Sequence, residues 1–146
     1  MTFKSVLNLL KDFGNNHQQI QRVEWGKLEE ITNSPTYPMM FIQPLPGEVL
    51  RHQNTDNFTI HFLDKMEADY SNREDVFNDM KLLCNDLTNF FDIDWFNHNH
   101  MYIEEGSTFD FIDGEMNDIV GGISLTIKCV SNYDIDCLAP ITPQNN

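Results

Sequence analysis

The spacing of apolar residues predicts two amphipathic helices. In the first helix, an apolar residue recurs every three or four positions from Phe3 to Phe13. Thr2 is its expected N-cap and residues 14–16, Gly-Asn-Asn, are its expected end. A longer stripe predicts a second helix over residues 71–91, with Ser71 and Glu74 placed as a capping box. The members of this stripe are Val76, Met80, Leu83, Cys84, Leu87 and Phe90.

The remaining apolar segments are short or alternate with polar residues, which predicts strands. Residues 37–43 form an apolar run bounded by prolines, typical of a short buried strand. Residues 48–52 and 58–63 are expected to form a hairpin, with the polar residues 53–57 as its turn. Further strands are predicted at 108–112 and 119–130, and residues 20–25 are compatible with another. Gly121-Gly122 inside the last strand indicates a bulge or a close backbone approach.

The order of these elements predicts an α+β fold, an antiparallel or mixed β-sheet packed against two α-helices. The 146 residues suit a single domain, expected over residues 1–139, with residues 140–146 as a flexible C-terminal tail. Residues 92–105 have no clean periodicity and predict no element. We find no apolar run of membrane-spanning length and expect no signal peptide.

The net charge of −14 is concentrated in the second part of the chain. Residues 1–63 carry five basic and six acidic side chains, a net −1, whereas residues 64–146 carry four and seventeen, a net −13. This balance argues against binding nucleic acid by phosphate neutralisation and against docking on anionic lipid. It is compatible with a solvated face, a docking site for a basic partner, or a surface that repels nucleic acid.

The sequence predicts no catalytic residue, metal ligand set or cofactor. His98 and His100 lie near Asp92 and Asp94, but no third histidine stands at ligand spacing. The Asp-Xaa-Asp pairs Asp92/Asp94 and Asp134/Asp136 lack the glycine and closing glutamate of a calcium loop. Three cysteines without a Cys-Xaa-Xaa-Cys motif favour reduced thiols, with Cys84 and Cys129 in the core. We therefore expect no enzyme, while a small metal-dependent enzyme stays the least favoured alternative.

Aromatic and methionine side chains among polar residues suggest a protein interface instead. The candidate subunit-interface residues are Trp95, Phe96, Met101 and Tyr102. Phe3, Met39 and Met40 are further candidates for exposed apolar surface. In the competing interpretation, Trp95 and Phe96 simply cap the core.

The element order and scattered residues resemble a family of virion proteins. The shared pieces are the first helix, Tyr37-Pro38 before a buried strand, a hairpin ending in Phe62-Leu63-Asp64, the helix opening Ser71-Asn72-Arg73-Glu74-Asp75-Val76, the late strand from Asp118 to Val130, and the closing Asp136-Cys137-Leu138-Ala139-Pro140. In this order they resemble the tail terminators and tail-completion or neck ring proteins of tailed bacteriophages, with crAss-like phages as the candidate group.

This resemblance implies a ring of 6 or 12 copies at the neck or tail, joined to other neck, portal or tail proteins. It implies residence in the virion, and in the host cytoplasm during assembly, without catalysis, cofactor, membrane or specific nucleic-acid binding. DNA would only pass through the ring. The acidic charge suggests that Asp75, Asp79 and Asp86 line the lumen of the ring and repel the DNA. The alternative is a soluble acidic adaptor that binds a basic partner.

Overall fold

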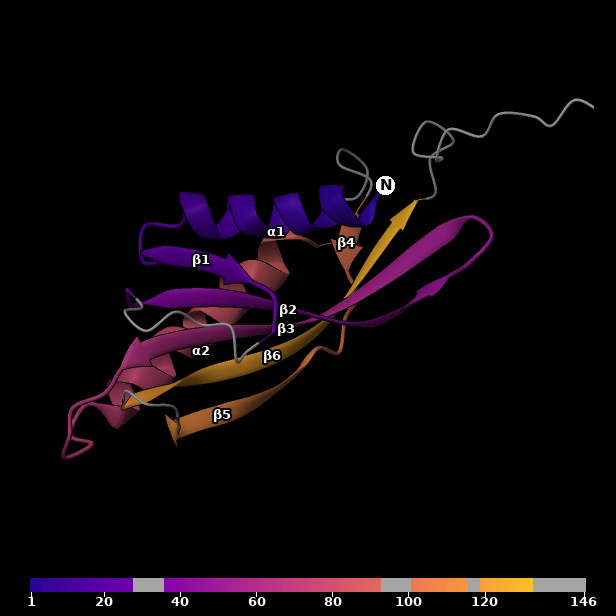
Figure 1. Cartoon of the computed structure of the whole chain (residues 1–146). Helices are drawn as coiled ribbons and strands as arrows, with labels where there is room; N and C mark the ends of the chain where they lie inside the picture. Colours follow the sequence, from indigo (N-terminus) through magenta and orange to yellow (C-terminus); the bar gives the residue numbers. More distant parts are fainter. Residues whose placement is uncertain (28–35, 93–100, 116–118, 133–146) are drawn as a thin grey trace, which may run out of the picture.

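The computed structural model describes residues 1–27, 36–92, 101–115 and 119–132, which form a mixed β-sheet with two helices (Figure 1). This arrangement confirms the α+β fold. The elements are α1 (Phe3–Asn16), β1 (Arg22–Trp25), β2 (Met39–Val49), β3 (Gln53–Lys65), α2 (Arg73–Phe90), β4 (Met101–Ile103), β5 (Thr108–Glu115) and β6 (Val120–Asn132). The tail predicted at residues 140–146 lies outside the described residues.

The six strands follow the order β1-β2-β3-β6-β4, and β5 also pairs with β6. Only β1 and β2 are parallel among the described pairs; the others are antiparallel. β4 and β5 lie one after the other along the same side of β6. From Ile103 opposite Cys129 to Thr108 opposite Thr126, the β4–β5 chain advances five residues while β6 advances three. The two extra residues make residues 104–107 bulge from this edge.

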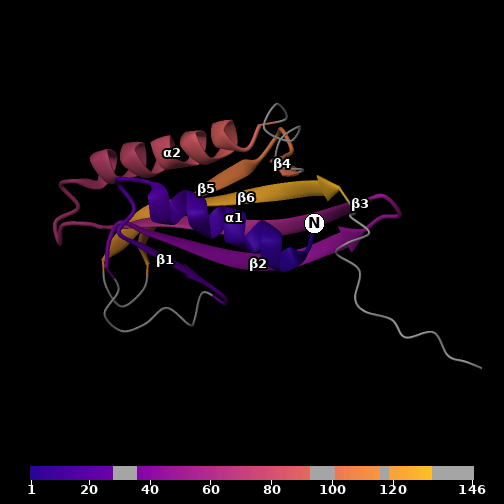
Figure 2. The same ribbon diagram turned by 90° about the horizontal axis from the view of Figure 1, so that it is seen from above.

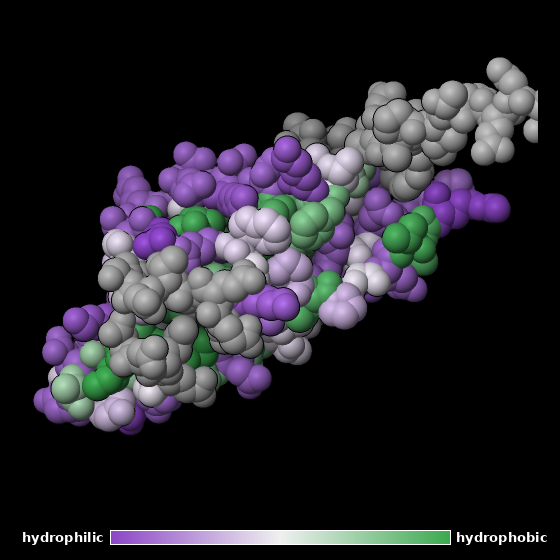
Figure 3. Space-filling view, in the orientation of Figure 1, coloured by the Kyte–Doolittle hydropathy of each residue, from purple (hydrophilic) through white to green (hydrophobic). Residues whose placement is uncertain are grey.

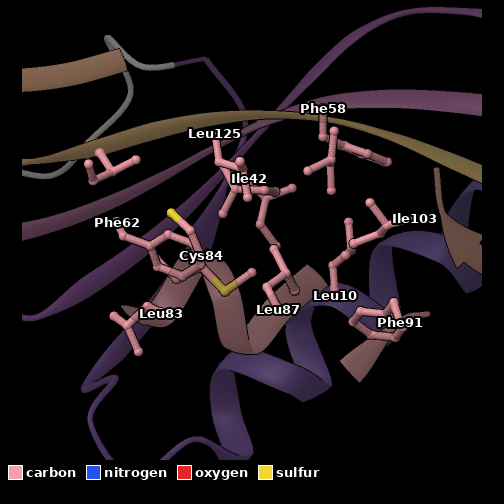
Figure 4. Close-up of a cluster of buried hydrophobic side chains, with 14 of the residues drawn as sticks. Leu10, Ile42, Phe58, Phe62, Leu83, Cys84, Leu87, Phe91, Ile103 and Leu125 are labelled. Carbon is pink, nitrogen blue, oxygen red and sulfur yellow. The ribbon is translucent and has the colours of Figure 1, made fainter. Parts of the chain in front are cut away.

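Both helices pack on one face of the sheet, as the view from above shows (Figure 2). Alternate residues of the strands enter the core between sheet and helices, among them Phe58, Ile60 and Phe62 of β3 (Figure 4). From α2, Leu83 and Leu87 fill the same core, and Leu10 of α1 meets them there. A smaller apolar cluster, Met39, Phe41, Leu63 and Ile112, lies on the opposite face. The sheet therefore buries apolar side chains on both faces.

The first helix follows its sequence pattern at the N-terminus. The Thr2 hydroxyl accepts a hydrogen bond from the Ser5 backbone N–H at 3.1 Å, which confirms the predicted cap. The helix ends at Asn16, the last residue of the predicted stop, although Gly14 and Asn15 are still helical. A Cβ added at Gly14 would lie 2.5 Å from Val23 Cγ2 and 2.7 Å from the Met40 sulfur. Gly14 therefore allows α1 to approach β1 and β2 closely.

The second helix begins two residues later than predicted and without a capping box. Its N-cap is Asn72, which makes no side-chain capping hydrogen bond. The Asn72 side chain instead joins the preceding link: its Oδ1 accepts from the Glu67 N–H at 2.7 Å and its amide donates to the Lys65 carbonyl at 3.3 Å. Ser71 lies in the turn before the helix. The predicted reciprocal pair of Ser71 and Glu74 is absent because the helix does not start at Ser71.

The hairpin of β2 and β3 exists, but its predicted boundaries are wrong. The turn lies at residues 50–52, and the polar residues 53–57 belong to β3. Pro44 and Pro46 do not end β2, because β1 pairs only with residues 39–42 and leaves this part of β2 at an edge. Proline is tolerated on an edge strand because no neighbour needs its missing N–H. The β3 strand of the hairpin stays paired with β6 as far as Gln53, which lies opposite Asn132.

The predicted glycine feature in the last strand is confirmed. Gly122 lies opposite Leu63, and a Cβ placed on it would overlap the backbone carbonyl oxygen of Phe62. The register between β5 and β6 shifts beside this point, between Asp113 and Glu115. Here glycine permits β6 to lie unusually close to β3.

Candidate functional site

The three aspartates predicted to face a lumen lie on one exposed side of α2. Asp75, Asp79 and Asp86 are spaced four and seven residues apart, which places them in one row, and all three are exposed. Among the described residues, no salt bridge holds Asp75 or Asp79. Asp86 Oδ2 lies 3.0 Å from His17 Nε2, which ties α2 to the end of α1. The row is therefore a solvent-facing carboxylate surface.

This carboxylate row also affects its surroundings. The Asp64 side chain, at the end of β3, has a raised pKa. Partial burial is the main cause of this increase, and the negative charge of Asp79 adds to it. The charge of Asp79 on α2 therefore affects the ionisation of Asp64, although Asp64 belongs to a different element.

The structure gives a mixed result for the predicted interface residues. Trp95 and Phe96 lie outside the described residues. Met101 is fully buried in the core, as are Met39 and Met40 on β2, so the expectation that these methionines are exposed is wrong. Met40 and Met101 belong to the core between the sheet and the helices, and Met39 belongs to the cluster on the opposite face. Tyr102 is half-buried, and Phe3 is exposed as expected.

Tyr102 lines a cleft between α2 and the bulged edge of the sheet. The cleft has a volume of about 550 Å³, and its walls include Lys81, Thr88, Asp92, Tyr102, Glu105 and Phe109. Cys84 also reaches it, but burial raises the pKa of that thiol to about 12. A thiol with such a pKa is protonated at neutral pH and is not an activated nucleophile. The cleft therefore has mixed polarity without a reactive group of this kind.

Cys129 behaves like Cys84. It is fully buried on β6, and burial together with the charge of Asp56 raises its pKa. Both cysteines are free, which confirms their expected place in the core. Cys137, the third, lies outside the described residues.

A buried histidine that sequence reasoning did not single out lies within the sheet. His61 Nδ1 is 2.7 Å from the Ser124 hydroxyl, and its Nε2 is 2.9 Å from Gln43 Oε1. Burial lowers the pKa of His61 to about 4, so the ring is neutral at pH 7. The signal available in the sequence was the alternation of β3, which places a polar residue between Ile60 and Phe62. This network joins three adjacent strands.

Along the described chain, the sheet has two open edges, at each of which the outer strand has no neighbour on one side. β1 has a strand neighbour on one side only, β2, and β5 likewise has only β6. Figures 1 and 2 place these strands at opposite edges of the sheet. Exposed edge strands carry unpaired backbone groups and readily bind another strand. They are therefore the sites at which the described fold can extend by strand pairing.

Exposed aromatic side chains accompany both open edges. On β1, Trp25 is 48% exposed, with Lys11 Nζ 5.5 Å from its ring centroid and Phe3 6.5 Å away. On β5, Phe109 and Phe111 are 42% and 56% exposed. Apart from these residues, Val49 and Leu50 are exposed at the tip of the β2–β3 hairpin, where Figure 3 shows a hydrophobic patch.

The described ranges hold no group of three or more histidine, cysteine, aspartate or glutamate side chains that could bind a metal. The proposed ligands His98, His100 and Asp94 lie outside those ranges, as do Asp134 and Asp136. None of the described helices is both long and apolar enough to cross a membrane. No protein-family model matches the sequence, and no match is found among curated proteins.

Proposed function

We propose that this protein is a structural ring protein of a phage neck or tail, acting as a head–tail joining protein or tail terminator. In this proposal, copies of the chain associate head to tail, portal-side and tail-side proteins bind above and below, and DNA passes through an acidic lumen. The protein resides in the virion and takes no part in catalysis.

The observation that carries the proposal is the pair of different open edges at opposite ends of one small sheet. A ring forms when one surface of a subunit binds a different surface of the next, so each subunit needs two unlike contact sites. β1 and β5 differ in length, direction and side chains, so they meet this requirement. A closed ring would also satisfy both edges at once.

The charge of α2 supports the lumen part of the proposal. Asp75, Asp79 and Asp86 form an exposed row that is repeated in every copy. A ring of such rows would present a continuous negative surface, which repels DNA phosphates and limits adhesion of the moving genome. The hydrophobic tip of the β2–β3 hairpin offers a separate contact for a neighbouring neck or tail protein.

The α2 row also favours a second candidate, an acidic adaptor that binds a basic partner. Such an adaptor would use the same carboxylates for attraction to the partner, and would need neither open edge. The metal-dependent enzyme remains the weakest candidate, since its ligands would come from residues outside the described ranges.

Mass photometry and negative-stain electron microscopy of the purified protein separate these candidates. Closed rings, or oligomers whose share grows with concentration, are expected for the ring protein. A strict monomer that binds a polylysine peptide, with binding lost at high salt, would favour the adaptor and contradict self-assembly in solution. Metal analysis of the wild-type protein and a His98→Ala variant tests the enzyme: bound metal that is lost in the variant would support it.

A further inference from the structure

We infer that β5 of one copy pairs antiparallel with β1 of the next, so that the assembled ring contains one continuous sheet. This inference rests on the proposed ring and names the surfaces that close it. Its partner is a second copy of this chain, bound through two edges that lie far apart in a single subunit.

Strand directions within the subunit set the orientation of the contact. β1 runs parallel to β2, β3 runs opposite to β2, and β6 opposite to β3, so β6 is parallel to β1. β5 is antiparallel to β6 and therefore to β1. Rotation about a ring axis preserves this relation between neighbouring copies. The contact is consequently antiparallel, the arrangement with the better-aligned ladder of hydrogen bonds.

The shorter edge fits within the longer one, and the two edges carry similar side chains on the helix side. The four residues of β1 fit along the eight of β5, beyond the bulge at 104–107. Phe111 packs on Phe77 of α2 at 4.8 Å between ring centroids, and Lys81 lies over Phe109, so both β5 aromatics are on the helix side. Trp25 is also on the helix side, beside α1. Pairing the edges would bring these exposed aromatics together.

The charges of the two flanks are complementary. Residues 1–27, which contain α1 and β1, carry four basic and two acidic side chains, a net +2. Residues 101–115, which contain β4 and β5, carry five acidic side chains and none that is basic, a net −5. Arg73 pairs with Asp113 and Lys128 with Glu104, so two of the five carboxylates are balanced within the subunit and the flank keeps a negative charge. Opposite charge favours the contact between unlike edges, whereas two β5 edges would repel each other. For this reason, the partner at each open edge is a second copy of the chain in head-to-tail orientation.

A continuous sheet has a consequence for the lumen. Because α1 and α2 lie on one face of the sheet, every copy would turn its helices to the same side of the ring wall. With that face inward, the Asp75, Asp79 and Asp86 rows of all copies line the channel together. The edge contact and the acidic lumen are therefore compatible in one arrangement.

Disulfide trapping tests the contact, in a Cys137→Ser background because Cys84 and Cys129 are buried. Glu24 lies next to Trp25 and faces away from the helices, as do Thr108 and Asp110 on either side of Phe109. Opposite positions in a strand pair meet the requirement of a disulfide for a Cα separation below about 7 Å. We expect Glu24→Cys combined with Thr108→Cys or Asp110→Cys to give a ladder of covalent dimers, trimers and larger species under mild oxidation.

Three controls make the result specific. Each single-cysteine variant should remain uncrosslinked, since a Glu24→Cys dimer would mean that like edges pair. The combination of Glu24→Cys with Glu48→Cys places the second thiol at an exposed position on the β2–β3 hairpin, away from β5, and should give little product. Mass photometry under reducing conditions checks that each variant assembles as the wild type does.

The outcomes separate this inference from the ring itself. Rings without a ladder would overturn the edge pairing and leave the proposed ring protein standing. A ladder of equal yield from the Glu48→Cys control would also overturn the pairing, because it would show random collision. A wild-type protein that stays monomeric at its highest soluble concentration, with no ladder in any variant, would contradict both.

Discussion

Gly122 of β6 lies against the backbone of Phe62 in β3 so closely that a Cβ atom at this position would overlap the Phe62 carbonyl oxygen. The contact lies between two inner strands, near the end of β3 and the start of β6, within an unbroken stretch of pairing. A backbone oxygen in a paired strand cannot move aside without disrupting its ladder. The close approach is therefore a structural requirement for glycine.

We predict that Gly122→Ala lowers the free energy of unfolding by about 3 kcal/mol, the upper end of the cost of overpacking. The neighbouring Gly121→Ala is the matched control. Its added Cβ would meet the Met66 sulfur at 2.6 Å, and a flexible methionine can shift, so we expect a cost of about 1 kcal/mol. Urea denaturation measures both. Equal losses for the two variants would contradict the distinction between a rigid and a movable neighbour.

The start of α2 gives a second prediction. Asn72 links the Glu67 N–H and the Lys65 carbonyl, so Asn72→Ala should cost about 1 kcal/mol of stability, the usual net value of such hydrogen bonds. Ser71→Ala, at an exposed turn position, should change stability by no more than about 0.5 kcal/mol. Thermal unfolding compares the two variants. A larger loss of stability for Ser71→Ala than for Asn72→Ala would contradict this prediction and support the capping box indicated by the sequence.

These two sites show what the sequence could and could not predict. Periodicity found both helices and the late strand because their apolar faces are regular. The Gly121-Gly122 pair within that strand indicated a bulge or a close backbone approach, and the structure shows the close approach at Gly122. Periodicity misplaced the start of α2, because the Asn72 side chain binds the backbone of Glu67 and Lys65, a contact that depends on the tertiary fold. It also misplaced the turn of the β2–β3 hairpin, because residues 53–57 are polar yet pair with both β2 and β6.

The candidate site was predicted less completely than the fold. Charge counting identified the acidic half of the chain, and helical spacing placed Asp75, Asp79 and Asp86 on one side of α2. The open edges could not be identified from sequence, because they depend on the strand order. Met101 was misjudged for a related reason: its buried position results from the short strand β4 joining β6, and residues 92–105 give no periodic signal for that strand.

His61 predicts a specific loss of stability in acid. Its pKa is about 4 in the folded protein and about 6.5 in an unfolded chain, so protons bind the unfolded state first as the pH falls. The contribution of neutral His61 to the free energy of unfolding is fully present above pH 6.5. It is lost as the pH falls from about 6.5 to 4, by up to about 3 kcal/mol in total. We expect a His61→Gln variant to be less stable at pH 7 but to have a flatter profile over this range.

Urea midpoints at several pH values test this prediction, and the difference between wild type and His61→Gln removes the contribution of other titrating groups. A His52→Gln variant serves as control, because His52 is exposed in the hairpin turn. It should retain the wild-type slope. Parallel profiles for wild type and His61→Gln would contradict the assignment of the acid sensitivity to His61.

The α2 row gives the prediction that bears most directly on function. In a phage that assembles with this protein, combining Asp75→Lys, Asp79→Lys and Asp86→Lys should slow DNA ejection or block packaging, since each substitution adds attraction for phosphate inside the channel. The matched control combines Glu48→Lys, Glu67→Lys and Asp69→Lys, which makes the same charge change at exposed sites outside the two helices. Circular dichroism establishes that both variants fold, and ejection is followed by release of labelled DNA. Normal ejection by the α2 variant would remove this row from the lumen, whereas equal defects in both variants would attribute the effect to total charge.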